Sequence, residues 1–298
     1  MLTRRALLKA AAGFGLATFG FTGYALGVEP WTHRIVRYRP RLPAWPQDLN
    51  LKIALVADDL ERIDQIVADT NKLRPDLVLL LGDYMAHHRF VSRSIPAPEW
   101  ANALARLKAP LGVHAILGNH DWWDDQDAMI RGKGPVRARR ALEAAGIPVY
   151  ENDAKRLRKD GRSFWLAGLG DQLALRVREG AWPRHRTRIR GVDDLSGTMA
   201  QIHDDAPLLL MAHEPDIFPR VSKRVALTVA GHTHGGQVAV AGFTPIVPSR
   251  FGSRYARGHI VEGDRHLIVS AGLGCSGAPI RFGVPPEIAL VELGGANA

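Results

Sequence analysis

Short apolar runs alternate with segments of helical periodicity from residue 51 to residue 293. Runs rich in leucine or β-branched residues predict strands that are buried on both faces. The predicted strands are Lys52–Ala57, Leu77–Leu81, Val113–Leu117, Ser163–Gly168, Pro207–Ala212, Ala226–Val229, His266–Ser270 and Ile288–Leu293. The predicted helices are Leu60–Leu73, Pro98–Lys108, Pro135–Ala145, Gly197–Ile202 and Pro215–Val221. Helices between such strands cover the faces of a sheet, so the pattern predicts an α/β layered fold.

Side chains that can bind metal or move a proton follow five of these strands. They are Asp58, the Asp83 of Gly82-Asp83, the Asn119, His120 and Asp121 of Gly118-Asn119-His120-Asp121, His213, and the pair His232 and His234. The carboxyl ends of strands form the ligand crevice in open α/β sheets, so we expect these side chains to converge. Each motif alone is weak, because Gly-Asp is a common turn and a lone histidine is often structural. The ordered set, however, indicates a functional site.

The strongest single motif is the stretch VAGHTHGGQV, Val229–Val238. Its two histidines are separated by one residue, and alternate residues of an extended segment project to the same side. The two glycines that follow let the backbone turn without side chains that would block a metal or a phosphate. We therefore interpret His232 and His234 as metal ligands.

Composition narrows the range of functions only slightly. The chain has 298 residues, 46% of them hydrophobic, which is ordinary for a globular protein. Its single cysteine, Cys275, excludes an intrachain disulfide. The formal net charge of +9 is spread along the chain, and its densest stretches are 155–162 and 184–190. Aromatic residues do not interleave with these basic residues and no nucleic-acid motif is present, so a solvated face is favoured over a nucleic-acid partner.

The first 28 residues resemble an export signal of the twin-arginine type. Arg4 and Arg5 precede a mostly apolar run over residues 10–28. The sequence Gly23-Tyr24-Ala25 offers a cleavage site, whereas an uncleaved run would serve as a membrane anchor. Residues 29–49, rich in Pro, Trp and Arg, are interpreted as a connector, and residues 50–298 as the catalytic domain. We therefore expect a periplasmic protein, or one on the outer face of the cytoplasmic membrane, either soluble or anchored by its N-terminus.

The order of motifs resembles the calcineurin-like metallophosphoesterase superfamily. The similarity runs from Leu51 to Leu293 and includes GDY, LGNHDWW, AHEPD, GHTHGGQ, VPSRFGSRYARG and GAPIRFGVPPE. It looks closest to an exported bacterial branch related to UDP-diacylglucosamine hydrolases, enzymes of lipid A synthesis. The resemblance implies a four-layer α/β sandwich with two facing mixed β-sheets.

The resemblance also implies a site with two divalent metal ions, and its ligand types suit Mn, Fe or Zn. Asp83 is implied to bridge the metals and to act in catalysis. Asn119, His213 and His232 are implied to complete one metal site, and Asp58 and His234 belong to the other. His120 is implied to lie beside the phosphate, where it stabilises charge or protonates the leaving oxygen. Two such metals clamp a phosphate and activate a hydroxide for in-line attack.

One position departs from the family pattern. The first motif of the family is Asp-x-His, but here Leu60 stands where the histidine belongs. The explanations left open are an error in the sequence, a gap filled by Asp59 or a water molecule, and a degenerate site that binds one metal. His87 and His88 are weaker substitutes, and more typical of a loop. Our hypothesis is that the first metal site is weakened and partially occupied.

These residues predict a metal-dependent phosphoesterase that acts on a phosphodiester or pyrophosphate, of either a small molecule or a lipid-linked envelope substrate. Asn119, His120 and Arg281 are the expected substrate contacts, with Arg250 or Arg254 as further candidates. The alternative is a catalytically impaired, single-metal protein that binds phosphate or a lipid headgroup.

Overall fold

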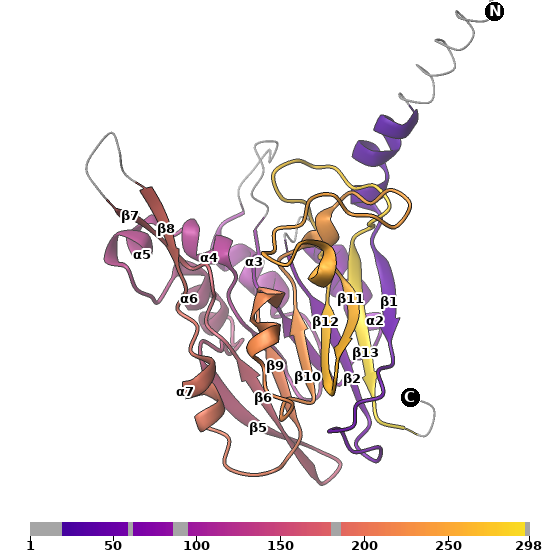
Figure 1. Cartoon of the computed structure of the whole chain (residues 1–298), viewed down its shortest axis with the longest axis vertical. Coiled ribbons are helices and arrows are strands. Elements are labelled where there is room, and N and C mark those ends of the chain that lie inside the picture. Colours follow the sequence, from indigo (N-terminus) through magenta and orange to yellow (C-terminus); the bar gives the residue numbers. More distant parts are fainter. Residues whose placement is uncertain (1–19, 59–61, 86–94, 180–185, 296–298) are drawn as a thin grey trace, which may run out of the picture.

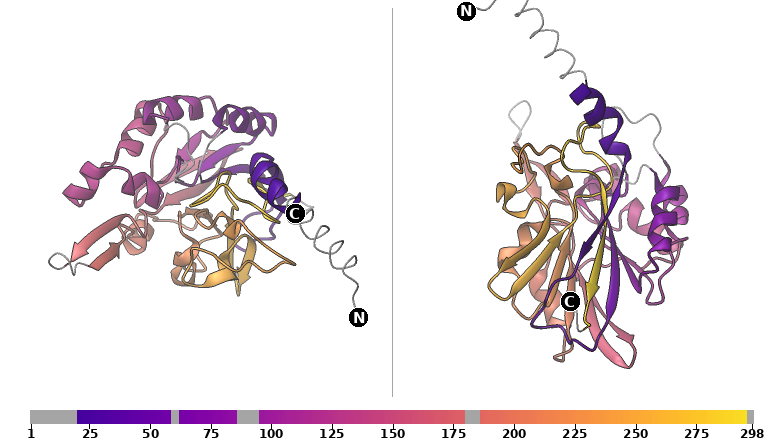
Figure 2. Two further views of the ribbon diagram at one scale, coloured as in Figure 1. Left: turned by 90° about the horizontal axis from the view of Figure 1, so that it is seen from above. Right: turned by 90° about the vertical axis from the view of Figure 1, so that its right-hand side faces the viewer.

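The computed structural model describes residues 20–58, 62–85, 95–179 and 186–295. Two β-sheets lie face to face in its centre (Figures 1 and 2). The first sheet has the order β1-β13-β2-β3-β4, and the second has the order β11-β12-β10-β9-β6-β5. The strands of the first sheet are β1 (Arg34–Tyr38), β13 (Glu287–Leu293), β2 (Leu51–Val56), β3 (Leu77–Leu80) and β4 (Val113–Ala115). Those of the second are β11 (Gly258–Glu262), β12 (Arg265–Val269), β10 (Leu227–Ala230), β9 (Leu208–Met211), β6 (Arg162–Gly168) and β5 (Asp153–Lys159).

The central core lies between the two sheets. Successive side chains of a strand point to opposite faces, so each buried strand serves two cores. In β2, Ile53 and Leu55 belong to the core between the sheets, whereas Ala54 and Val56 belong to the core on the outer face. Across the gap, Leu209 of β9 completes the central core. This two-sided burial is why these strands are continuously apolar in the sequence.

Helices cover the outer face of each sheet. α2 (Ile63–Lys72), α3 (Ala97–Leu104) and α6 (Arg137–Ala144) pack on the first sheet, and α7 (Leu195–Ala200) and η2 (Pro215–Arg220) pack on the second. The left view of Figure 2 shows this order of helices, sheet, sheet and helices, the mixed α/β layers that the sequence predicted. The expected helix at 215–221 is a 3-10 helix, because Pro219 lies inside it and cannot donate an α-helical hydrogen bond.

The apolar pattern did not predict the polar edge strands or several short elements. β5 and β11 lie at the edges of the second sheet, and β1 lies at an edge of the first. β7 (Leu175–Glu179) and β8 (Arg186–Arg190) form a separate hairpin, and α4 (Asn119–Trp123) and α5 (Gln126–Arg131) follow β4. The two basic stretches fall largely on β5 and β8, where charged side chains suit exposed edges.

The N-terminal part of the described chain packs against the domain. Residues 20–27 form a helix, and Glu29 accepts hydrogen bonds from the backbone amides of Gly283 and Val284. Residues 29–49, interpreted as a connector, pack against the domain: β1 pairs with β13, and Trp45 is buried in the central core. Within residues 20–295 as described, no helix is both long and apolar enough to cross a membrane.

Candidate metal centre

The strands of both sheets that run parallel end at one edge of the molecule, the upper edge in Figure 1. The predicted residues follow these ends: Asp58 after β2, Asp83 after β3, Asn119 after β4, His213 after β9, and His232 and His234 after β10. Four of them have a positive φ, namely Asp58 (55°), Asp83 (54°), His232 (69°) and His234 (49°). Such backbone strain is uncommon outside glycine and is concentrated at functional sites.

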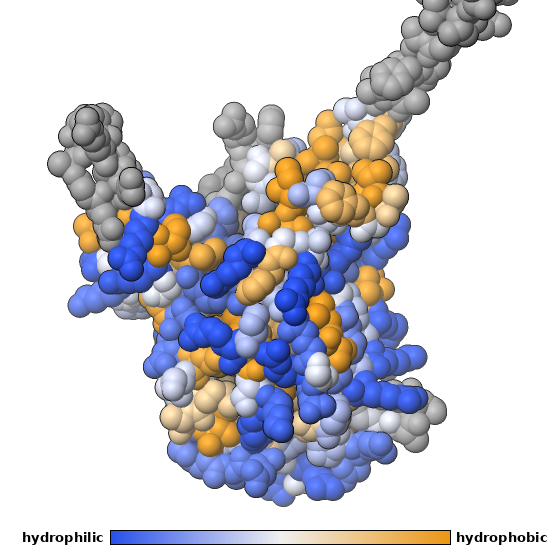
Figure 3. Space-filling model, viewed as in Figure 1, coloured by the Kyte–Doolittle hydropathy of each residue, from blue (hydrophilic) through white to orange (hydrophobic). Residues whose placement is uncertain are grey.

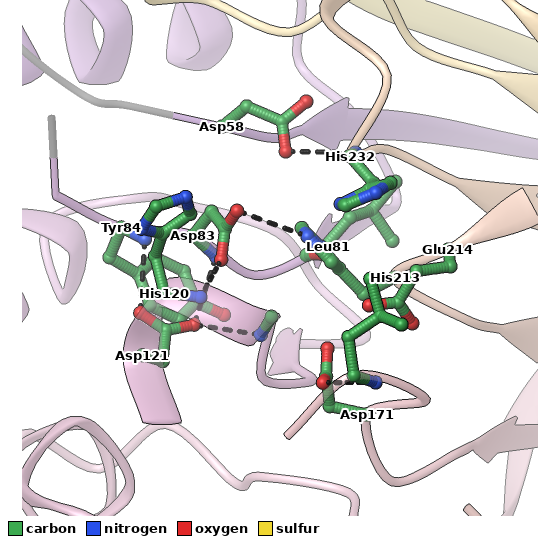
Figure 4. Close-up of polar contacts among 12 residues, drawn as sticks. Asp58, Leu81, Asp83, Tyr84, His120, Asp121, Asp171, His213, Glu214 and His232 are labelled. Carbon is green, nitrogen blue, oxygen red and sulfur yellow. Dashed lines mark hydrogen bonds and ion pairs between the residues drawn. The ribbon is translucent and has the colours of Figure 1, made fainter. Parts of the chain in front are cut away.

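Asp83, His213 and His232 form the compact half of the site. Their ligand atoms all lie within 4.8 Å of one another. His213 Nε2 is 3.1 Å from Asp83 Oδ2, and the rings of His213 and His232 are 5.1 Å apart. In Figure 4, Asp83 lies between these two histidines on one side and His120 on the other. The fold therefore brings together three residues that follow three different strands.

His213 is held in a fixed orientation. Its Nδ1 lies 2.7 Å from the carbonyl oxygen of Leu81, a contact that fixes Nδ1 as the donor and turns Nε2 toward Asp83. Burial favours the neutral forms of Asp83 and His213, but the opposite charges of the two side chains outweigh the effect of burial. They hold the pKa of Asp83 below its usual range and raise the pKa of His213 well above its own. A metal ion at this position would displace the proton of His213.

Asp121 holds the turns that carry the ligands. Its carboxylate accepts hydrogen bonds from the backbone amides of Gly118 (2.8 Å), Asp83 (2.9 Å) and Tyr84 (3.1 Å). The amide of His120 donates in turn to Asp83 Oδ1 at 2.8 Å. Gly118 is required here, because a Cβ at this position would lie 2.3 Å from Asp83 Oδ1. The Gly-Asn-His-Asp motif is thus a rigid support for Asp83.

Asp58 and His234, the residues expected to bind the first metal, form the looser half of the centre. Asp58 is fully buried, and its Oδ1 accepts the backbone N–H of His232 at 3.0 Å. Burial raises the pKa of Asp58 to about 7, and burial together with the charge of Arg281 lowers the pKa of His234 to about 3. Among the described residues, neither side chain belongs to a cluster of three or more metal-capable groups. Asp59, Leu60, His87 and His88 lie outside the described residues.

Two buried ligand atoms support metal binding. Asp58 Oδ2 and Asn119 Oδ1 have no hydrogen-bond partner among the described residues. A buried polar atom without a partner is costly, and a cation would satisfy both. The carboxylate, amide and imidazole donors fit a first-row divalent ion. The residues present therefore fit the metal site that the sequence predicted.

Sequence reasoning missed two buried carboxyl groups behind His213. Ligand atoms of Asp171, His213 and Glu214 lie within 4.8 Å of one another. Glu214 Oε2 accepts the backbone N–H of Gln172 at 3.1 Å, and the Gln172 side chain donates to the Glu214 backbone at 2.8 Å. Burial and the charge of Glu214 raise the pKa of Asp171 well above its usual value. Asp171 lies just beyond the end of β6, so the rule that found the other ligands would also have found it.

A cleft of about 1300 Å³ opens beside the compact half. It is lined by His120, Trp123 and Arg176 near the metal ligands, and by Met85, Ile95 and Trp100 further out. The Arg176 guanidinium lies 3.4 Å from the centre of a Trp123 ring, and the His120 ring lies 5.1 Å from it. Arg176 had no signal in the sequence, because the hairpin β7-β8 brings it to the cleft. Trp123 lies in the LGNHDWW motif, but the sequence analysis gave it no role. The cleft offers three arginines, Arg137, Arg140 and Arg176, and an apolar wall to a substrate.

Arg281 occupies a different environment from the one expected. Its side chain is fully buried, and its guanidinium donates to the backbone carbonyls of Ala271, Gly274 and Val284. These hydrogen bonds fix the loop after β12 beside Asp58. The Arg281 side chain has no exposed surface that a substrate could contact. The two further arginine candidates carry ion pairs at the surface, Arg250 with Asp216 and Arg254 with Glu262.

Comparison with known proteins identifies the family of the chain. The family described as Calcineurin-like phosphoesterase matches residues 48–236. The metallophosphoesterase YkuE of Bacillus subtilis is 29% identical over 316 aligned positions, covering 99% of each chain. Phosphodiesterase YaeI of Escherichia coli is 29% identical over 315 positions, covering 98% of this chain and all of the relative. A putative metallophosphoesterase of Caenorhabditis elegans, F40B5.2, is 30% identical over 82% of this chain and 48% of its own. The family typically uses a dinuclear metal centre, and the chain belongs to the calcineurin-like phosphoesterases, hydrolases of phosphoric esters.

Proposed function

We propose that this protein hydrolyses a phosphodiester or pyrophosphate whose non-reacting part is apolar or aromatic. The observation that carries the proposal is the cluster of Asp83, His213 and His232, which the hydrogen bond from His120 to Asp83 connects to a cleft with an apolar outer wall. The relative YaeI is named a phosphodiesterase, which supports this reaction class. A lipid-linked envelope substrate, as in the branch related to UDP-diacylglucosamine hydrolases, fits the same cleft.

The side chains divide the work around the phosphate. Bound divalent metals supply charge neutralisation and lower the pKa of an attacking water. His120 borders the cleft on the far side of Asp83 from the metal-binding histidines, where its ring can donate a proton to the leaving oxygen. Burial lowers the pKa of His120 and the Asp83 carboxylate opposes that shift. Arg176 is placed to pair with a phosphate oxygen at the mouth of the cleft.

The N-terminal sequence supports a place of action outside the cytoplasm. Twin arginines precede an apolar run that leads into the helix at 20–27. We propose export by the twin-arginine pathway and retention at the outer face of the cytoplasmic membrane or in the periplasm. Export of an already folded chain is compatible with a buried metal site, since the metal can be inserted before translocation.

The departure at Leu60 favours a second candidate function. With one metal site weakened, the protein would bind a phosphate group or lipid headgroup and hydrolyse it slowly or not at all. Binding of a phosphodiester in the presence of Mn²⁺ without turnover would support this alternative.

The test is hydrolysis of an aryl phosphodiester by the purified chain with added Mn²⁺, Fe²⁺ or Zn²⁺. We expect metal-stimulated hydrolysis that His232→Ala removes. His203→Ala is the matched control, because His203 is an exposed histidine outside the site. Equal rates in the His232→Ala variant and the unaltered chain would refute the assignment.

A further inference from the structure

Exposed apolar side chains gather at the edge of the molecule that carries the metal ligands. Phe21 and Tyr24 lie on the helix at 20–27, and Val240, Phe243 and Ile246 lie on the loop after the His232–His234 turn. Phe243 and Ile246 are 66% and 77% exposed. We call these five residues the apolar rim; an apolar area beside the N-terminal helix is visible at the upper right of Figure 3. Contiguous exposed apolar surface of this kind marks an interaction site.

The two parts of the apolar rim are joined by direct contacts. The Phe21 ring packs on Phe282 with centroids 4.2 Å apart, and Tyr24 meets the same ring edge-on. Phe282 is in turn bonded to the loop, because the backbone N–H of Ala239 donates to its carbonyl at 2.7 Å. The helix and the loop are therefore neighbours held by one shared residue.

A tight turn presents the apolar side chains of the loop. Val240 and Phe243 exchange backbone hydrogen bonds of 2.9 and 3.0 Å. Between them, Ala241 and Gly242 both have positive φ, 50° and 82°. Two positive φ values in succession are typical of a type I′ turn, which is unfavourable for alanine. The loop thus keeps a strained turn whose flanking residues, Val240 and Phe243, remain exposed to solvent.

The helix is fixed to the same edge by the backbone. The amide of Arg281 donates to the carbonyl of Ala25 at 3.0 Å, and the buried Glu29 carboxylate holds the amides of Gly283 and Val284. The sequence that immediately precedes this helix, residues 10–19, is uncharged and mostly apolar. In the sequence, this run directly adjoins the helix that carries Phe21 and Tyr24.

The charged residues beside the apolar rim indicate the class of partner. Residues 237–261 contain no Asp or Glu but include Arg250, Arg254 and Arg257. Two of these arginines pair with acidic residues from outside the segment, Arg250 with Asp216 and Arg254 with Glu262. A segment that combines exposed apolar side chains with arginines and has no acidic residue of its own suits an anionic lipid surface. We propose that the apolar rim inserts into the lipid surface of an anionic membrane, as a second contact beyond the N-terminal segment. Because Val240 follows His234 closely in the chain, this contact places the metal ligands at the membrane surface.

The proposal is tested by measuring the depth of single residues in the full chain, so its outcome does not depend on catalytic activity. Cys275 is the only cysteine and is buried, so Cys275→Ala provides the background for nitroxide labels at Phe243→Cys and Ile246→Cys. The control is Val261→Cys, which is also an exposed apolar residue. It pairs with His266 near the start of β12, away from the metal-binding edge.

The chain is bound to vesicles of phosphatidylglycerol and phosphatidylethanolamine, and label collisions with oxygen and with a water-soluble nickel chelate are compared. We expect the oxygen-to-nickel ratio to rise at 243 and 246 and to stay unchanged at 261. An unchanged ratio at all three positions would overturn the proposal. Spin–spin broadening at 243 without a rise in the ratio would also overturn it, because the rim would then contact a second copy of the chain.

A second variant separates lipid contact from folding. Phe243→Asp should lower the oxygen-to-nickel ratio of a label at 246 in vesicles. Hydrolysis of a soluble aryl phosphodiester and the thermal midpoint should stay at the level of the parent chain, because Phe243 is exposed and lies outside the metal centre. A label at 246 that reports the same lipid contact in this variant would contradict an insertion that depends on the apolar rim.

Discussion

The two halves of the metal centre are built in different ways. The half formed by Asp83, His213 and His232 rests on strand ends and brings its ligand atoms within 4.8 Å of one another. The half formed by Asp58 and His234 lies outside that cluster, and Asp58 uses one oxygen for a backbone hydrogen bond. The family pattern Asp-x-His would place a further histidine in this looser half, at the position where the present chain has Leu60.

The difference shows what fixes a ligand in place. Hydrogen bonds orient two ligands of the compact half: the carbonyl of Leu81 orients His213, and the amide of His120 orients Asp83. Such partners in the second coordination shell raise metal affinity because the ligand geometry is set before binding. In the looser half, Asp58 and His234 belong to no cluster of three or more metal-capable groups among the described residues. We therefore expect the compact half to bind metal first and to carry most of the activity.

The largest effect should come from removing a histidine of the compact half. His213→Ala should lower kcat/KM for an aryl phosphodiester by more than about 100-fold, the upper end of losses from weaker second-shell changes. His234→Ala, the matched change in the looser half, should cost less. Steady-state kinetics at saturating Mn²⁺ would measure both, with thermal unfolding as the control for folding. Equal losses would mean that the two halves contribute alike.

His120 should have the next largest effect, through proton transfer. Since general acid catalysis contributes on the order of 10²- to 10⁴-fold, His120→Asn should lower kcat within that range and leave Mn²⁺ affinity unchanged. The loss should grow as the leaving group becomes more basic, which kinetics with a series of aryl and alkyl phosphodiesters would show. The same loss for every leaving group would assign His120 to charge stabilisation alone.

A smaller effect is expected from the carboxyl groups behind His213. Glu214→Gln should weaken Mn²⁺ binding by about 10- to 100-fold, because second-shell partners set the orientation of a ligand. Titration calorimetry would give the affinity. Glu143→Gln is the control, since Glu143 is an exposed carboxylate on α6. Unchanged affinity in Glu214→Gln would remove Asp171 and Glu214 from the support of the metal centre.

The smallest effect should come from Asp58. We propose that the site of Asp58 and His234 is weakened, so the purified chain should hold one tightly bound metal, and Asp58→Ala should leave that number unchanged. It should also lower kcat/KM by less than His213→Ala does. Elemental analysis after dialysis against a chelator would give the metal content. Two tightly bound metals in the unaltered chain would refute a weakened first site.

The predicted α/β layers followed from local patterns. Strands such as β2 and β9 are buried on both faces, so their apolar runs are visible in the sequence. The polar edge strands β1, β5, β8 and β11 were not predicted, because one face of an edge strand is open to solvent and its composition resembles that of a loop. The helix expected at 215–221 was wrong in type for a local reason, the proline inside it.

The candidate ligands were found by one rule, that chemistry gathers at the carboxyl ends of strands. The rule located Asp83, His213 and His232, which the structure brings together. It did not show that Asp171 and Glu214 stand behind His213, or that Arg176 reaches the cleft from a hairpin. The motif PIRFG led to the separate expectation that Arg281 contacts a substrate, whereas backbone carbonyls surround its guanidinium in the structure.

The sequence by itself determined the buried strands, the turns that follow them and the residue types of the metal centre, because periodicity and turn chemistry are properties of neighbouring residues. Only the tertiary structure decided which ligand atoms come close, which arginine is buried and which apolar residues remain exposed. Those outcomes depend on how the two sheets, the hairpin and the N-terminal helix pack. Packing joins residues hundreds of positions apart, such as Ala25 and Arg281, and no local pattern records it.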